Sequence, residues 1–179
     1  MDVHPFLALL AGLATGTFAG WINGMVITKG RIPPFIATLG MLGIARGMAL
    51  VITEGVSHPV LVPLFLNIGN AKFLGLPIPL YFVIVTFIAI SVMMHMTVFG
   101  RHVYAIGGDE RVARLQGIPV DRQKLKIYML SGFLAALAAV VMTGRLAATP
   151  PSVAQGIELQ AIAAVIIGAS ASPAGAASW

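Results

Sequence analysis

Residues 100–126, GRHVYAIGGDERVARLQGIPVDRQKLK, form a charged segment between two long apolar stretches. The segment holds six of the eleven Lys and Arg residues and three of the six Asp and Glu residues. No charged residue occurs from Phe73 to Gly100 or from Ile127 to Gly144. Apolar stretches of this length predict transmembrane helices, so we expect the charged segment to be a loop in water between two spans.

Within this segment, residues 109–117 are predicted to form a short amphipathic helix of two or three turns. Acidic residues follow a Gly-Gly break and would lie in the first turn, where they favour the positive end of the helix dipole. Apolar residues recur every third position, arginines lie off that stripe, and Gly117 is placed to end the helix. The residues of this predicted surface helix are Asp109, Glu110, Arg111, Val112, Arg114, Leu115, Gly117 and Ile118. Such a helix packs on the lipid headgroups or on a partner protein; the alternative is a solvated loop that obeys the positive-inside rule.

The composition indicates an integral membrane protein. Of the 179 residues, 58% are hydrophobic and 9% are charged, and the mean hydropathy is +0.94. A soluble domain has about 25% charged residues. The net charge of +5 is not interpreted as nucleic-acid binding, because most basic residues flank apolar runs. There is no cysteine, which excludes disulfides and thiolate metal sites in this sequence.

The apolar pattern predicts an all-α polytopic bundle that forms a single transmembrane domain over residues 1–179. Four full spans are expected at about 5–27, 33–53, 79–99 and 126–143, with a partial or re-entrant fifth at 158–169. A short interfacial or re-entrant helix is expected near 61–68. Placing residues 29–31 and 100–126 in the cytoplasm puts eight of the eleven Lys and Arg residues there, which fixes the orientation.

Small residues predict where the helices pack closely. Glycines occupy every fourth position of the first span, which makes one smooth stripe on a helix, and the fourth span has a similar small-residue face. The predicted packing positions are Gly12, Gly16, Gly20, Gly24, Gly132 and Ala136.

Polar residues within the spans are candidates for a substrate path, namely Asn23, Thr38 and Arg46. A charge near mid-bilayer costs about 2.5–3.5 kcal/mol on insertion scales, so Arg46 either snorkels outward or faces the bundle interior. The sequence has no phosphate-binding loop, no zinc-binding helix motif and no nucleophile elbow. We therefore predict no catalytic residue and no metal site, and favour a transporter subunit driven by a partner over an enzyme.

Several motifs occur in an order that resembles the permease subunits of bacterial ABC importers for simple sugars, of the ribose, xylose and arabinose type. They are RIPPFIATLG at 31–40, IARG at 44–47, YAIGG at 104–108, ARLQGI at 113–118 and ELQAIAAVIIG at 158–168. The resemblance runs from about residue 16 to residue 168. Compared with that family, the chain begins and ends within the pattern of spans, so we expect it to be truncated at both ends.

The resemblance implies a translocation path for a monosaccharide, built with a second permease subunit in a bacterial inner membrane. It implies two further kinds of partner: cytoplasmic ATPase subunits, which use the ATP, and a periplasmic sugar-binding protein. No cofactor would be bound by this chain. The helix near 109–117 would contact the ATPase. Two other functions stay open: a permease for branched-chain amino acids or nucleosides, and a non-transporting membrane fragment with a structural role.

Overall fold

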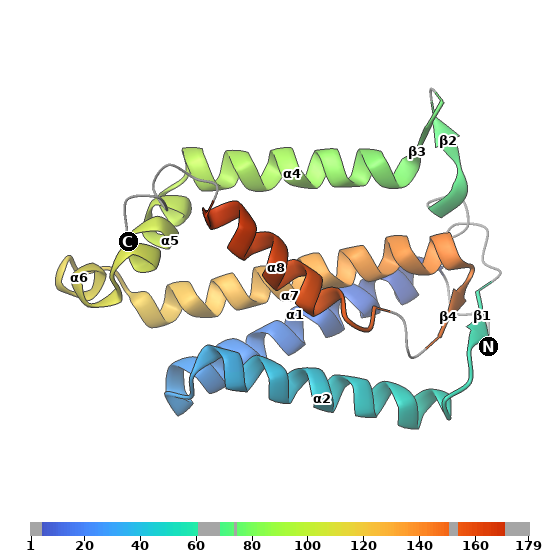
Figure 1. Cartoon of the computed structure of the whole chain (residues 1–179), viewed down its shortest axis with the longest axis horizontal. Coiled ribbons are helices and arrows are strands. Elements are labelled where there is room, and N and C mark those ends of the chain that lie inside the picture. Colours follow the sequence, from blue (N-terminus) through green and yellow to red (C-terminus); the bar gives the residue numbers. More distant parts are fainter. Residues whose placement is uncertain (1–4, 61–68, 74, 151–153, 171–179) are drawn as a thin grey trace.

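The structure is a computed structural model that describes residues 5–60, 69–73, 75–150 and 154–170. Helices dominate it (Figure 1). They are α1 (Pro5–Gly30), α2 (Pro34–Thr53), α4 (Ile78–Met96), α5 (Val98–Gly108), α6 (Glu110–Leu115), α7 (Val120–Leu146) and α8 (Ile157–Ser170). Two antiparallel pairs of two-residue strands complete the described chain: β1 (His58–Pro59) with β4 (Ala148–Thr149), and β2 (Lys72–Phe73) with β3 (Leu76–Pro77). The predicted fold class, an all-helical membrane protein, is confirmed.

Four of the described helices, α1, α2, α4 and α7, are long and apolar enough to cross a membrane. They lie where the four full spans were expected, except that α7 begins at Val120, six residues before the expected start at 126. The apolar part of α8, Ile157–Gly168, is shorter than a span. The helix expected near 61–68 falls outside the described residues.

Large apolar side chains are exposed along these helices, as a lipid environment requires. Val51 is 79% exposed, Phe87 is 74% exposed and Val165 is 71% exposed. Such exposure on several helices would be unfavourable in water but matches the hydrocarbon core of a bilayer.

The closest packing joins α1 to α7 through small residues. A Cβ atom added at Gly16 would lie 2.5 Å from the Cβ of Ala136 and 2.7 Å from the carbonyl oxygen of Gly132, and one at Gly20 would collide with the carbonyl of Tyr128. The two backbones approach this closely only because these positions carry no side chain. Gly24 faces Leu125 in the same interface.

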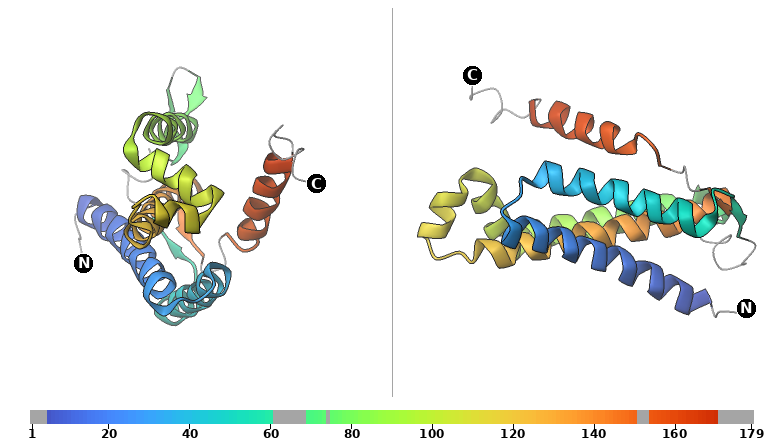
Figure 2. Two further views of the ribbon diagram at one scale, coloured as in Figure 1. Left: turned by 90° about the vertical axis from the view of Figure 1, so that its left-hand side faces the viewer. Right: turned by 90° about the horizontal axis from the view of Figure 1, so that it is seen from below.

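Gly12 differs from the other glycines of this stripe. An added Cβ there would meet no atom of the described chain within 4 Å. Gly12 therefore packs against no helix of the described chain, because the N-terminal end of α1 diverges from α7 (Figure 2).

Different elements lie at the two ends of the helix bundle (Figure 1). The turn between α1 and α2 lies at the same end as α5 and α6, and the short strands lie at the other end. At the strand end, the side-chain amide of Asn70 donates a 3.0 Å hydrogen bond to the carbonyl of Gly144, which ties the connection before β2 to α7. The helices α5 and α6 of the charged segment thus lie at the end opposite the strands.

Candidate functional site

The charged segment begins with α5, a helix at residues where the sequence predicts a loop. Thr97 caps the helix by accepting a 3.3 Å hydrogen bond from the amide of Gly100, and its hydroxyl donates to the carbonyl of Met93 at 2.6 Å. Gly100 is buried, and an added Cβ would collide with the backbone of Met94. The chain can therefore turn sharply between α4 and α5 only with glycine at this position. The glycines suggested a break, but the spacing of Phe99, Val103 and Ile106 was an available sign of a helix.

Local interactions fix both ends of α6. A carboxylate oxygen of Asp109 accepts hydrogen bonds from the amides of Arg111 at 2.7 Å and Val112 at 3.1 Å, which is N-cap geometry. At the other end, Gly117 has φ +79°, and the amide of Ile118 donates to the carbonyl of Ala113 at 3.1 Å. This is a Schellman motif, in which the residue after the helix adopts a left-handed backbone conformation that favours glycine. The helix is six residues long, shorter than the expected two or three turns, because this ending comes directly after Leu115 and Gln116.

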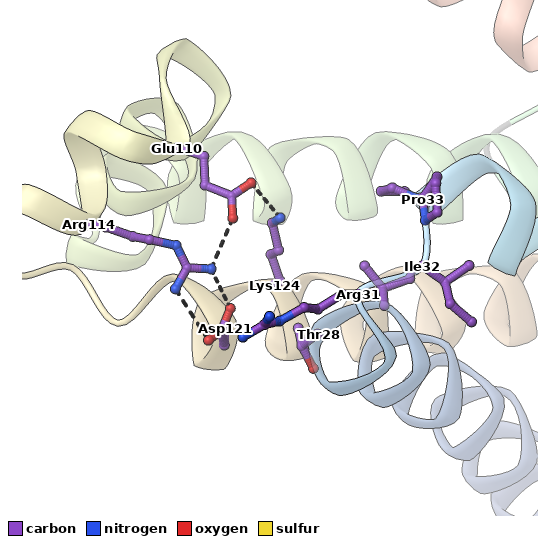
Figure 3. Close-up of a pocket in the computed structure, with 10 residues that line it drawn as sticks. Thr28, Arg31, Ile32, Pro33, Glu110, Arg114, Asp121 and Lys124 are labelled. Atoms are coloured by element: carbon purple, nitrogen blue, oxygen red, sulfur yellow. Dashed lines mark hydrogen bonds and ion pairs between the residues drawn. The ribbon is translucent and has the colours of Figure 1, made fainter.

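A network of charged side chains holds α6 to the start of α7 (Figure 3). Arg114 lies 2.6 Å from Asp121 and 3.0 Å from Glu110, and Lys124 lies 2.6 Å from Glu110. Asp121 and Lys124 are not among the site residues predicted from the sequence. Their partners in α6 are seven and fourteen positions away, beyond the turn at Gly117, so no helical spacing pointed to the contacts.

These contacts favour the charged forms of the groups in α6. The hydrogen bond from Lys124, followed by the one from Arg114, holds the pKa of Glu110 below its usual value. The hydrogen bonds to Asp121 and then to Glu110 raise the pKa of Arg114. Glu110 and Arg114 are therefore both held in their charged forms at neutral pH.

The network borders an open pocket of about 520 Å³ at this end of the bundle. Its walls combine α6 and α7 with the turn between α1 and α2, including Thr28, Arg31 and Pro33 (Figure 3). The two basic clusters that are far apart in the sequence, at residues 29–31 and 100–126, thus lie around one space.

Beneath the charges, α6 rests on a small buried contact. Ala113 and Val120 are each 1% exposed. Gln123 is buried as well, and its side-chain nitrogen lies 2.8 Å from Nδ1 of His102, which links α7 to α5. The buried residue of α6 is therefore Ala113, whereas its larger apolar residues Val112 and Leu115 are exposed.

The opposite side of α6 is open. Leu115 is 88% exposed and Val112 is 48% exposed, whereas Ile118 is partly buried. Arg111 is exposed beside them. Of the predicted stripe, two residues point away from the described chain and one points toward it.

The candidates for a substrate path do not come together. Asn23 is partly buried on α1, and the hydroxyl of Thr38 donates to the carbonyls of Pro34 and Phe35 within α2. Arg46 forms an ion pair with Glu158 of α8, at 3.8 Å between a guanidinium nitrogen and a carboxylate oxygen. Arg46 therefore points to α8, and its side chain is still 33% exposed. Among the residues that the structure describes, no group of three or more His, Cys, Asp and Glu side chains could hold a metal ion.

Comparison with known proteins places this arrangement in a transporter context. The chain is similar to the ribose import permease protein RbsC of Bacillus subtilis, with 42% identity over 171 residues that cover 93% of this chain and 52% of the relative. It is 39% identical to RbsC of Escherichia coli K12 over 174 residues, or 94% of this chain and 54% of the relative. The L-arabinose transport system permease protein AraH of the same strain is 35% identical over 163 residues, or 91% and 50%.

The chain spans about half the length of these curated relatives. No solved structure matches it. A family model described as the permease component of branched-chain amino acid transport systems matches residues 1–178, nearly the whole sequence. The chain therefore belongs to this family of transporter permease components.

Proposed function

We propose that this chain forms part of the membrane path of an ATP-driven importer for a monosaccharide. In the proposed assembly it pairs with a second permease subunit in a bacterial inner membrane. Cytoplasmic ATPase subunits hydrolyse the ATP, and a periplasmic protein delivers the sugar. The named relatives support a sugar over an amino acid as the solute, because the matched ribose and arabinose permeases align with more than nine-tenths of this chain.

One observation of the structure carries the proposed contact with the ATPase. Leu115 is 88% exposed on a helix whose two ends and charged face are all fixed by hydrogen bonds. A rigid element that presents a large apolar side chain in water is typical of a docking surface. The basic residues around it favour the cytoplasmic side for this end of the bundle, where the ATPase would be.

The test is co-purification of the tagged chain with the sugar-importer ATPase produced in the same cells. Truncating a buried leucine costs about 2–5 kcal/mol in a packed core, whereas an exposed ion pair contributes about 0–1 kcal/mol. Leu115→Ala should therefore greatly reduce the amount of ATPase recovered. Arg111→Ala is the matched control, because it removes an exposed side chain of α6 that lies outside the charge network. Recovery that falls for Arg111→Ala but not for Leu115→Ala would show an electrostatic contact instead.

The solute is tested separately by uptake of labelled ribose and arabinose. Cells that lack their own ribose permease but keep its ATPase and binding protein should gain uptake when they produce the chain. Uptake of leucine without uptake of either sugar would favour the amino-acid alternative. Absence of any uptake would leave the chain as a membrane fragment with a structural role.

A further inference from the structure

Arg46 and Glu158 bring opposite charges together within the apolar part of the molecule. Arg46 belongs to α2, and Glu158 lies in the first turn of α8. Arg46 is twelve positions after Pro34, so it lies roughly 18 Å along a helix of about 30 Å. An ionisable residue at this depth is unfavourable in lipid unless it has a partner, and Glu158 provides one.

The geometry leaves much of the pair's hydrogen-bonding capacity unused. The separation of 3.8 Å allows attraction between the charges but is too long for a hydrogen bond. Each side chain remains about one-third exposed, at 33% for Arg46 and 32% for Glu158. Neither side chain makes a hydrogen bond within the described ranges of the chain. The guanidinium therefore has free N–H donors, and the carboxylate has free lone pairs.

The second helix, α8, brings the carboxylate of Glu158 to α2. α8 begins alongside the middle of α2 and stands apart from the α1–α7 pair (Figures 1 and 2). Glu158 is the acidic residue in the first turn of this short helix. The ion pair of Arg46 and Glu158 thus places two charged groups between two largely apolar helices, α2 and α8.

We propose that Arg46 and Glu158 form a recognition site for sugar hydroxyl groups within the membrane-spanning part of the chain. A hydroxyl group can accept a hydrogen bond from the guanidinium and donate one to the carboxylate. Neighbouring hydroxyls of one sugar can therefore satisfy the free donors of Arg46 and the free acceptors of Glu158 together. The proposal rests on the proposed function, because it takes the solute to be a neutral polyhydroxylated molecule. A zwitterionic amino acid could also contact both charges, so the experiment includes it.

The absence of cysteine from the sequence allows an accessibility test in membrane vesicles. Leu50→Cys places a thiol one helical turn from Arg46, on the same side of α2. Leu39→Cys is the matched control, two turns from Arg46 in the other direction, and the two leucines are similarly exposed at 45% and 47%. Each thiol is reacted with a water-soluble reagent, alone and with increasing ribose or leucine.

We expect ribose to slow the reaction at position 50 and to leave position 39 unchanged. Adding Arg46→Gln or Glu158→Gln to the Leu50→Cys chain should raise the ribose concentration needed for this protection about tenfold or more, because a hydrogen bond to a charged group is lost. The double variant Arg46→Gln with Glu158→Gln leaves no unpaired charge in the membrane. It should fold even if a single variant does not, and should likewise lose protection.

Three results would overturn the inference. Protection that persists in the double variant would place the sugar elsewhere, with the proposed function intact if ribose uptake is observed. Protection by leucine but not by ribose would assign the pair to an amino acid. No protection at position 50 by either solute would show that the pair only positions α8, and the uptake measurement would decide separately whether the sugar function fails.

Discussion

Glu110 is one of two residues of α6 whose ion pairs join this helix to α7; the other is Arg114. One of its carboxylate oxygens accepts a hydrogen bond from Arg114 and the other accepts one from Lys124. Its side chain is 40% exposed, and exposed ion pairs contribute only about 0–1 kcal/mol each. The pairs therefore set the position of α6 more than they determine the stability of the whole chain.

Acidification should release α6 before it unfolds the bundle. The pKa of Glu110 lies below its usual value of 4.5, so the stabilisation that it provides is complete above about pH 4.5 and is lost as the pH falls through the lowered pKa. Hydrogen exchange should show that the α6 amides lose protection in that range while those of α7 keep theirs. Glu110→Gln should weaken this pH dependence; an unchanged profile would mean that Asp121, whose pKa is also lowered by its hydrogen bond from Arg114, is responsible.

At the same scale, the sequence predicted what is local and missed what is not. The roles of Asp109 and Gly117 follow from their own backbone surroundings, an N-cap and a left-handed turn, and both occur near the expected positions. The contacts of Glu110 with Lys124 and of Gln123 with His102 join different helices. They depend on how the chain turns between those helices, which spacing alone does not determine.

Among the helices, the contact between α1 and α7 shows how far periodicity predicts packing. A glycine at every fourth position indicated one smooth stripe, and Gly16, Gly20 and Gly24 do face α7 closely in the structure. Gly12 continues the stripe in sequence but not in space. Two straight helices that cross at an angle stay close over only a few turns, and the crossing angle depends on the partner helix.

The different surroundings of Gly20 and Gly12 allow two matched substitutions in α1 to be compared. Gly20→Ala should destabilise the bundle by about 1–3 kcal/mol, because the added methyl group collides with the backbone of Tyr128 and forces the helices apart. Gly12→Ala adds the same group where it meets no atom of the described chain, so stability should stay the same or rise slightly. Thermal unfolding in detergent, followed by circular dichroism, measures both. Equal melting temperatures for the two variants would show that the contact at Gly20 is not close-packed.

At the scale of the whole molecule, geometry and charge agree on an orientation. The sequence assigned residues 29–31 and 100–126 to the same side of the membrane from their basic residues alone. The structure collects the turn between α1 and α2 with α5 and α6 at one end (Figure 1), so one membrane surface can contain both segments. The spans themselves were predictable because length and hydropathy are local properties, whereas the placement of α8 beside α2 depends on a contact across 112 positions, from Arg46 to Glu158.

The orientation predicts which positions a reagent can reach from outside the cell. Cysteines introduced at Gly30 and Gln116, which are both exposed at the basic end, should resist a membrane-impermeant thiol reagent in intact cells and react after the cells are opened. Ser57→Cys is the positive control, because it is exposed just before β1, at the strand end of the bundle, and differs from serine by one atom. It should react in intact cells. Labelling of Gly30→Cys and Gln116→Cys from outside, with protection of Ser57→Cys, would reverse the orientation and move Leu115 to the side of the membrane opposite a cytoplasmic ATPase.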